Sequence, residues 1–545
     1  MLSRAARILR TIVAKTGVEV AFASVVAVVL TWPLVPQFWT EAVGAQGTDT
    51  PKHLWTLWWM RRELWSGEPG LHTTLVNFPE GMDLFPISPL DGLLAAALPL
   101  GVVPLSNLLA LLHVTLLGVC AAWLGREVVG TRVAGLTAGL LAQGTAFTGF
   151  ALEVGVGELR LSWWIPLGLT VLARAHRLGR HRDFILLGVT LAAAVLACFY
   201  HGLFLAVATA TWALATLRRD RRLLAGYVLA AGLALAIVVP VVRGFAASYG
   251  AEDARVLLAG ASVSVDELVT PGTPGAGYDG GRYLGLGYLA LAALGVAAGG
   301  RRTFAWLAVF GVCLTLALGP VLSWSGAPVV LGGRGFVLPM QAFNTMLSAI
   351  GEPINFPARF LAPAMIALAV LGAFATRWRL ATALVPFAVA EVLAADKVAF
   401  PRATARLYDM TVFEGQGVGA VADLSMVVQS AEPAVRTRSI SAQIALDRPF
   451  ATVPIERLTR WSKSGDTALR QLGLFAAVDR YERGERGDAP DVAADLAWLR
   501  EQGFTHLLLT HRNDTPDLRS NALLTAVCGE PVRARNATLW TLPSE

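Results

Sequence analysis

The sequence predicts a polytopic α-helical membrane protein with about eleven transmembrane helices and a C-terminal extracytoplasmic α/β domain. Three observations carry this prediction. The 545 residues have a mean hydropathy of +0.56, and only 15% are charged, against about 25% in soluble proteins. Apolar runs of bilayer length recur through residues 1–395, whereas residues 396–545 have a soluble composition. Basic residues concentrate in alternate short connections between the runs.

The spans follow from apolar runs of roughly 16–22 residues, the length that a bilayer requires. We predict them at 18–36, 106–125, 133–149, 161–175, 184–200, 202–217, 223–242, 283–299, 303–322, 359–376 and 380–395. Residues 90–103 are also apolar but contain Pro99 and are bounded by Pro104. We interpret them as an interfacial or re-entrant piece, because a further span there would invert every later connection.

The orientation follows from the positive-inside rule. The N-terminal tail and alternate connections hold 18 of the 27 basic residues in 1–395, so these parts are predicted to be cytoplasmic. The N-terminal run has no small-residue cleavage site and is read as a retained first span of a multi-pass protein. An odd number of spans then leaves the C-terminal domain outside. Arg outnumbers Lys 41 to 4, which suggests a GC-rich bacterial genome and hence the bacterial cytoplasmic (inner) membrane.

The first outer loop, about 37–105, is long and contains a predicted helix at 51–65. Its four tryptophans and its leucines form an apolar face, so we expect it to lie in the interface with Trp at headgroup level. In the domain at 396–545, the segments 449–454, 505–511 and 537–542 read as strands, and 491–503 reads as a helix. No cluster of basic and aromatic residues outside the membrane region indicates nucleic-acid binding.

The sharpest candidate is Asp49, which follows the first span and opens the helix at 51–65. A carboxylate there can take a proton from an acceptor hydroxyl while a lipid phosphate leaves. His53 lies one helical turn further on and could contact the same substrate. The alternative is structural, since Asp49 or Thr50 is a good N-cap and Pro51 a good first helical residue.

A second candidate group lies on the short outer loop at 150–164. Glu153, Glu158 and Arg160 stand there between apolar spans and could bind a metal, a phosphate or a sugar hydroxyl. A solvated turn with a Glu158–Arg160 pair explains them equally well. His201, at an outer junction of two spans, fits a packed histidine better than a catalytic one.

Two arginines begin spans at the outer face. Arg282 and Arg359 could each fork onto a lipid phosphate, or extend toward the headgroups. The loop acids Asp266, Glu267 and Asp279 read as solvated side chains. The chain has no Walker A, G-x-S-x-G or HExxH motif, which argues against an ATP-driven motor, a serine hydrolase or a zincin.

The order of these parts resembles the GT-C membrane glycosyltransferases. The matching features are Asp49 after the first span, the helix at 51–65, the Asn-Phe-Pro-Glu-Gly run at 77–81, the acidic loop at 153–158 and the Phe-Pro-Ala-Arg-Phe run at 356–360. The resemblance covers the whole length as architecture. It implies a polyprenyl-phosphate-linked sugar donor, Asp49 as the base, Glu153 or Glu158 as a second acidic site and Arg359 as a phosphate contact.

The resemblance also sets the expected function. It implies transfer of a sugar to an envelope glycan, glycolipid or protein acceptor at the outer face of the lipid bilayer. The Trp-Trp-Asp run of oligosaccharyltransferases is absent, because Met60 follows the pair at 58–59, and no second acid follows Asp49. These departures put metal dependence in doubt and disfavour an asparagine-glycosylating enzyme. A divalent metal ion stays a possible cofactor, and no other cofactor is expected. Two alternatives remain, a lipid-linked glycan flippase or other transporter and a non-catalytic envelope assembly protein.

Overall fold

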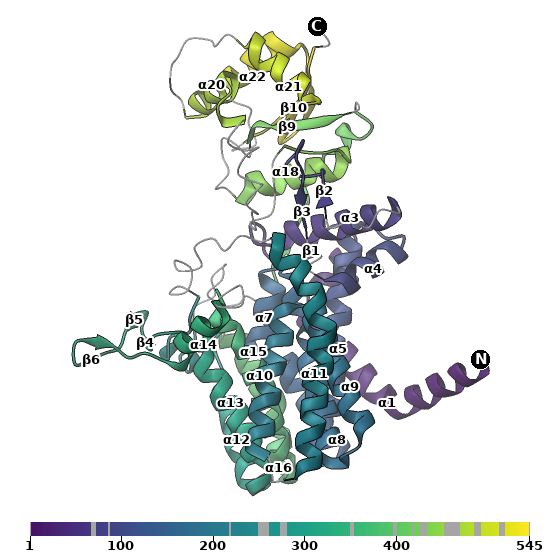
Figure 1. The fold of residues 1–545 in the computed structure, drawn as a ribbon, viewed down its shortest axis with the longest axis vertical. Coiled ribbons are helices and arrows are strands. Elements are labelled where there is room, and N and C mark those ends of the chain that lie inside the picture. Colours follow the sequence, from purple (N-terminus) through teal and green to yellow (C-terminus); the bar gives the residue numbers. More distant parts are fainter. Residues whose placement is uncertain are drawn as a thin grey trace.

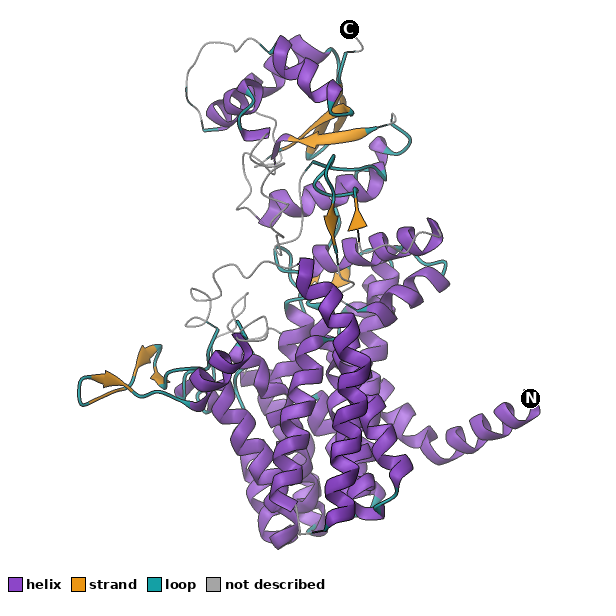
Figure 2. Cartoon of the chain, viewed as in Figure 1, coloured by secondary structure: helices purple, strands orange, loops and turns teal. Residues whose placement is uncertain are grey.

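A bundle of long helices carries a smaller helix-and-strand part at one end (Figure 1). The computed structural model describes residues 2–66, 72–84, 88–216, 220–248, 261–272, 281–348, 354–395, 400–416, 419–425, 433–451, 469–483, 485, 492–511 and 518–543. Strands are concentrated in the C-terminal part and in a small ribbon that projects from the side of the bundle (Figure 2). Both features bear on function below.

Every predicted span contains a helix. These helices are α1 (Leu2–Leu30), α5 (Val102–Val129), α6 (Arg132–Gln143), α8 (Trp164–Leu178), α9 (His181–Ala197), α10 (Phe199–Thr216), α11 (Arg221–Ser248), α12 (Leu286–Gly299), α13 (Phe304–Ala317), α15 (Leu361–Phe374) and α16 (Arg379–Ala395). Among the described residues, four segments are long and apolar enough to cross a membrane by themselves, namely Val102–Val129, Phe199–Thr216, Arg221–Val241 and Pro357–Arg377. The protein is thus a mostly helical membrane protein, and the count of eleven spans remains a prediction.

Apart from α1, which has 29 residues, the other predicted spans correspond to helices of 12 to 17 residues. Both α12 and α13 have 14 residues and rise about 21 Å at 1.5 Å per residue, less than the roughly 30 Å of a hydrocarbon core. A 3-10 turn, η3 (Gly300–Thr303), joins them. Similarly, α6 gives way at Gly144 to α7 (Ala146–Glu153) and then to the 3-10 helix η1 (Gly157–Trp163).

Small residues let the first helices pack closely. A Cβ on Gly135 of α6 would lie 2.7 Å from the Ala122 carbonyl oxygen of α5, and one on Gly139 would lie 2.7 Å from the Gly118 carbonyl oxygen. Glycines and alanines at this spacing let two backbones approach, the usual way in which helices associate within a membrane. This contact sets the position of α5, which lines the site described below.

The basic connections gather at one end of the bundle. Arg177, in the last turn of α8, forms an ion pair with Glu127 of α5 at 2.6 Å. Arg377, in the 3-10 turn η5 (Ala375–Arg377), donates to the Ala298 carbonyl of α12 at 2.7 Å. The C-terminal part sits at the opposite end (Figure 1). The charge asymmetry predicted from the sequence is therefore an asymmetry between the two ends of the folded bundle.

The first loop forms α3 (Thr50–Ser66), α4 (Pro89–Ala97) and a small ribbon of β2 (His72–Thr73) and β3 (Met82–Asp83). Helix α4 has nine residues, too few to cross a bilayer. The tryptophan face of α3 differs from expectation. Trp55 and Trp59 are buried against protein, and Trp55 Nε1 donates to Gln443 Oε1 at 2.8 Å. These two rings thus pack against protein, including Ile440 of the C-terminal part, whereas Trp65 remains exposed.

The C-terminal part contains a four-stranded mixed sheet in the order β11 (Val532–Ala534), β12 (Ala537–Thr541), β10 (Phe504–Thr510), β9 (Ala420–Asp423). Strand β10 runs antiparallel to β12 and parallel to β9. Helices α18 (Pro433–Leu446), α20 (Gly473–Glu482), α21 (Ala493–Glu501) and α22 (Leu518–Cys528) pack with it. The strands expected at 505–511 and 537–542 and the helix at 491–503 are present. Of the strand expected at 449–454, Phe450 forms an isolated bridge with Val421, and residues 452–454 lie outside the described residues.

Candidate active site

The chain that follows α1 is held by backbone hydrogen bonds to two separate segments, 403–405 and 153–154. Strand β1 (Ala42–Val43) pairs with β8 (Thr404–Ala405), which follows the last helix of the bundle. The amide of Ala45 donates to the Glu153 carbonyl at 2.7 Å, and the amide of Asp49 donates to the Val154 carbonyl at 3.1 Å. The two outer loops predicted to carry acids are therefore joined through their backbones, which the sequence did not indicate.

Asp49 lies at the end of this hydrogen-bonded segment, immediately before α3. Its carbonyl accepts from the amide of His53 at 3.1 Å, and its carboxylate pairs with Lys52 at 2.6 Å. The Asp49 side chain is 18% exposed, so one face of the carboxylate remains open to solvent or a ligand. Asp49 thus begins the helix, and its carboxylate is partly exposed at the helix start.

Glycines bring the second acidic loop onto the first turn of α3. Gly44 and Gly155 have positive φ angles, +132° and +64°, and a Cβ on either would collide with the hydroxyl of Thr50. A Cβ on Gly157 would lie 2.9 Å from His53 Nδ1. The loop therefore needs glycines for two reasons. A side chain at these positions would collide with α3, and glycine adopts the positive φ angles without strain.

His53 and Glu158 meet across this contact. His53 Nε2 lies 3.4 Å from Glu158 Oε2, and both side chains are largely buried. Burial lowers the pKa of His53 below its usual 6.5, although Glu158 and Asp49 oppose this effect. The imidazole is therefore neutral at physiological pH and can accept or donate one hydrogen bond.

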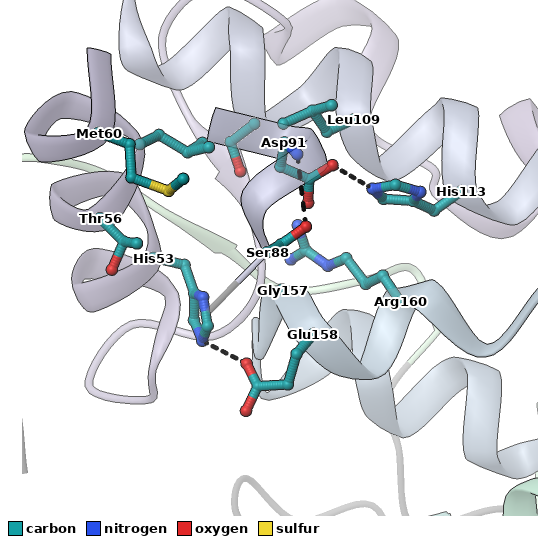
Figure 3. Close-up of a pocket in the computed structure, with 12 residues that line it drawn as sticks. His53, Thr56, Met60, Ser88, Asp91, Leu109, His113, Gly157, Glu158 and Arg160 are labelled. Atoms are coloured by element: carbon teal, nitrogen blue, oxygen red, sulfur yellow. Dashed lines mark hydrogen bonds and ion pairs between the residues drawn. The ribbon is translucent and has the colours of Figure 1, made fainter. Parts of the chain in front are cut away.

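A small pocket, open at its mouth and with a cavity volume of about 30 Å³, adjoins this pair. Its polar wall combines His53 and Glu158 with Arg160, Asp91 and His113, and its apolar wall is formed by Leu57, Met60 and Leu109. Arg160 lies between the two pairs, beside Ser88 (Figure 3). Its guanidinium donates to the Val43 carbonyl at 2.9 Å, and burial lowers the pKa of Arg160 to about 10, so it remains charged.

Sequence reasoning missed the pair on the far side of this pocket. Asp91 Oδ1 lies 2.9 Å from His113 Nε2, and Trp163 Nε1 donates to His113 Nδ1 at 3.2 Å. His113 belongs to α5, within a predicted span, and a buried histidine there is a functional signal that could have been used. Asp91 was hidden because it reads as a residue of the first turn of α4, capped by Ser88.

His201 and Arg359 lie on the other side of Glu158. His201 Nε2 is 2.9 Å from the Glu158 carbonyl oxygen, and both Glu158 and Arg359 act electrostatically on His201. Arg359, in the 3-10 turn η4 (Pro357–Phe360), is 8% exposed and lies between the rings of Tyr200 and Phe356, each 4.5 Å from its Cζ. Its Nη1 is buried without a hydrogen-bond partner among the described residues.

Two other candidates have structural partners. Arg282 makes a two-pronged ion pair with Glu267, at 2.9 and 2.8 Å from Nη1 to the two carboxylate oxygens. Glu153 is buried, which raises the pKa of its carboxyl group, and accepts from the amide of Ala403 at 3.4 Å. Asp266 accepts from Ser325, as described below, and Asp279 lies outside the described residues.

Within the described ranges, no three histidine, cysteine, aspartate or glutamate side chains are grouped so that they could hold a metal ion. Asp49 pairs with Lys52 within the first turn of α3, and it is the neutral imidazole of His53 that faces Glu158 across the two loops.

Comparison with known proteins gives a likeness of fold. No protein-family model matches the chain, and no curated protein matches it significantly. Among solved structures, the arabinofuranosyltransferase AftD from Mycobacteria matches with a TM-score of 0.53 and 13% identity, over 98% of this chain and 40% of that one. The oligosaccharyltransferase of Archaeoglobus fulgidus, solved with Zn and sulfate, matches with a TM-score of 0.44 and 13% identity, over 93% of this chain and 69% of that one.

The chain thus spans about two fifths of the mycobacterial enzyme's length. At 13% identity the likeness concerns architecture, and it extends over almost the whole of the present chain. Over nearly its entire length, the protein is similar in fold to the mycobacterial arabinofuranosyltransferase, as the resemblance in architecture predicted from the sequence implied.

Proposed function

We propose that this protein is a membrane glycosyltransferase that moves a sugar from a polyprenyl-phosphate donor to an envelope glycan, glycolipid or protein acceptor. In this proposal the end of the bundle that carries the C-terminal part faces outward, and the end with the basic connections faces the cytoplasm. The observation that carries it is the meeting of Asp49 and His53 with the Glu158 loop. Nearby lies the buried Arg359, whose Nη1 has no hydrogen-bond partner among the described residues.

The proposed reaction is a direct displacement at the anomeric carbon. An acceptor hydroxyl attacks this carbon, its proton passes to the Asp49 carboxylate, and the bond to the lipid phosphate breaks with its electron pair on the phosphate oxygen. Lys52 pairs with the Asp49 carboxylate at 2.6 Å and holds it at the start of α3. Arg359 faces the developing phosphate charge, because preorganised cations stabilise charge as it forms.

The pocket of Figure 3 is assigned to the sugar or to the acceptor. Its polar wall offers donors and acceptors of both kinds, while Leu57, Met60 and Leu109 can cover the apolar face of a pyranose or furanose ring. The C-terminal part, tied to α3 through Trp55 and Gln443, closes this end of the bundle and contributes to acceptor choice.

One observation supports the transporter alternative. The Asp91–His113 pair is buried beside α5, and paired ionisable groups within a helical bundle are typical of proton or substrate pathways. Such a transporter would change the side on which a lipid-linked glycan accumulates and would leave the structure of that glycan intact. The glycan comparison that follows separates the two classes.

Deletion of the gene is expected to remove one sugar from an envelope glycan or glycolipid. The measurement is mass spectrometry of glycans and lipid-linked precursors from the wild type, the deletion strain and the complemented strain. A glycan that is lighter by one sugar residue, restored on complementation, supports transfer, and the mass difference gives the class of sugar. Full-length precursors that accumulate unchanged would support the transporter, and an identical profile in all strains would contradict both activities.

His53 is expected to set the acidic limit of activity. Because burial lowers its pKa, the imidazole is neutral above pH 6.5 and takes up a proton only below that value. Its protonation removes the hydrogen-bond acceptor in the pocket, so transfer should fall as the pH decreases below about 6. In His53→Gln, which cannot titrate, this acidic limb should flatten while activity at neutral pH falls several-fold. An unchanged pH–rate profile in this variant would exclude His53 from the site.

A further inference from the structure

An exposed ribbon separates α13 from the next helix, α14 (Pro339–Ser348). It contains β4 (Ser323–Trp324) paired with β5 (Ala327–Pro328), and β6 (Val330–Leu331) paired with β7 (Arg334–Gly335). Both hairpins close through two-residue turns with positive φ, at Ser325-Gly326 and at Gly332-Gly333. Such turns match the twist of the flanking strands. The ribbon, residues 320–338, is thus a well-formed element with its own hydrogen bonds.

The surface of this ribbon is apolar and uncovered. Trp324 is 56% exposed, Val330 59% and Leu331 61%, and Phe336 and Val337 are exposed as well. Arg334 is the only charged residue between Pro320 and Leu338. Grouped apolar side chains of this size rarely face water in a soluble part of a protein, so the ribbon requires a partner.

The base of the ribbon is held firmly to the bundle. The carboxylate of Asp266 accepts from the amide of Ser325 at 2.7 Å, and the amide of Val265 donates to the Ser323 carbonyl at 3.1 Å. From this base the ribbon projects sideways, away from the long axis of the bundle (Figures 1 and 2). An element that runs across the helix axes at the end of a span lies parallel to the membrane plane.

The position and composition of the ribbon favour lipid as its partner. It leaves the end of α13, whose Phe304, Leu307 and Val312 are exposed on the outer surface of the bundle. The apolar surface therefore continues from the lipid-facing side of the helix onto the ribbon. Tryptophan is enriched at the headgroup level, and an arginine without nearby acids on the ribbon suits anionic headgroups.

We propose that residues 320–338 form a finger that inserts Trp324, Val330 and Leu331 into the outer leaflet of the membrane around the protein. This role does not depend on the proposed sugar transfer, only on the placement of the bundle in a bilayer. The finger leads through α14 toward Arg359. Insertion of the finger would therefore help to fix how deep in the membrane the segment that carries Arg359 lies.

Spin labels on the full-length protein test the proposal. Because three of the four cysteines are buried, a Cys528→Ser background leaves an added cysteine as the accessible one. Labels are placed by Val330→Cys on the finger, by Leu307→Cys on α13 as the lipid control and by Val412→Cys in η6 (Thr411–Phe413) as the water control. The protein is reconstituted in vesicles of phosphatidylcholine and phosphatidylglycerol, and collisions with oxygen and with a water-soluble nickel chelate are measured.

The finger label is expected to resemble the lipid control. Its ratio of oxygen to nickel accessibility should exceed that of the Val412→Cys label several-fold, and lipids labelled near the headgroup should broaden its spectrum more than lipids labelled at the chain end. Nickel accessibility equal to that of the water control would overturn the proposal. Broadening that grows with the protein-to-lipid ratio would also overturn it, because the partner would then be a second copy of the chain.

A charge on the finger provides the second test. Val330→Asp alters an exposed side chain, so the unfolding temperature in detergent should match the parent. In the same vesicles, a label introduced by Val337→Cys should move from lipid-like toward water-like accessibility when Val330→Asp is added, since a carboxylate at this depth is costly. A label that stays equally lipid-like with the added charge would contradict insertion of this hairpin.

Discussion

Replacement of Asp49 with asparagine is expected to reduce sugar transfer about 10²- to 10⁴-fold, the range that a general base contributes. The change removes the proton-accepting carboxylate while it preserves the size of the side chain. Asparagine begins helices as well as aspartate does. The backbone bonds of residue 49 to Val154 and His53 do not involve the side chain. The rate at which membranes from each complemented strain restore the missing sugar is the measurement.

Two control variants separate the base from the ion pair and from the fold. Lys52→Met breaks the same 2.6 Å pair and leaves the carboxylate, so it should keep much more activity than Asp49→Asn. Asp220→Asn changes a carboxylate near the opposite end of the bundle, just before α11, and should transfer at the parental rate. Equal losses in Lys52→Met and Asp49→Asn would assign the effect to the ion pair. A fully active Asp49→Asn protein would remove Asp49 from the mechanism.

The helices of the bundle were predictable because the bilayer imposes strong local rules. Each span needs a run of apolar residues long enough to cover the hydrocarbon core, and each cytoplasmic connection carries basic residues. Each of these signals is local, because the apolar run of a span and the basic residues beside it are neighbours in the sequence. The ends were less certain: α1 begins at Leu2 although its apolar run begins near residue 18, and α13 stops at Ala317 where the ribbon starts.

Contacts between distant segments were not predictable in this way. The apolar face of α3 was correctly expected, but an apolar face is the same whether it meets lipid or protein. Only the fold reveals that Trp55 meets Gln443, 388 residues further along the chain. For the same reason Asp49 and Glu158 were found as separate candidates. Their loops can approach because Gly155 and Gly157 have no side chain that would collide with α3. The pairing of Arg282 with Glu267 was equally invisible.

The second large effect is expected at Arg359. Its guanidinium is sandwiched between Tyr200 and Phe356, and its Nη1 lacks a hydrogen-bond partner within the described part of the chain. A buried cation held in this way is preorganised to receive an anion. In Arg359→Lys the charge remains, but the planar fork and its stacking on the rings are lost, so a phosphate can no longer be bound through two parallel hydrogen bonds. We expect transfer to fall about 10²-fold, as when one preorganised donor is removed.

The same helix segment offers a matched control. Arg377 stands at the opposite end of α15, where its Cζ lies 5.5 Å from the Phe374 ring. Arg377→Lys therefore makes the same chemical change near an aromatic ring, far from the candidate site, and should leave transfer near the parental rate. Both variants are compared in the membrane assay used for Asp49, over a range of donor concentrations. If Arg359→Lys and Arg377→Lys behave alike, Arg359 serves packing, and the lipid phosphate must be recognised by other residues. If only Arg359→Lys is impaired, and more donor does not restore the rate, the arginine acts on the departing phosphate in the transition state and not merely in ground-state binding.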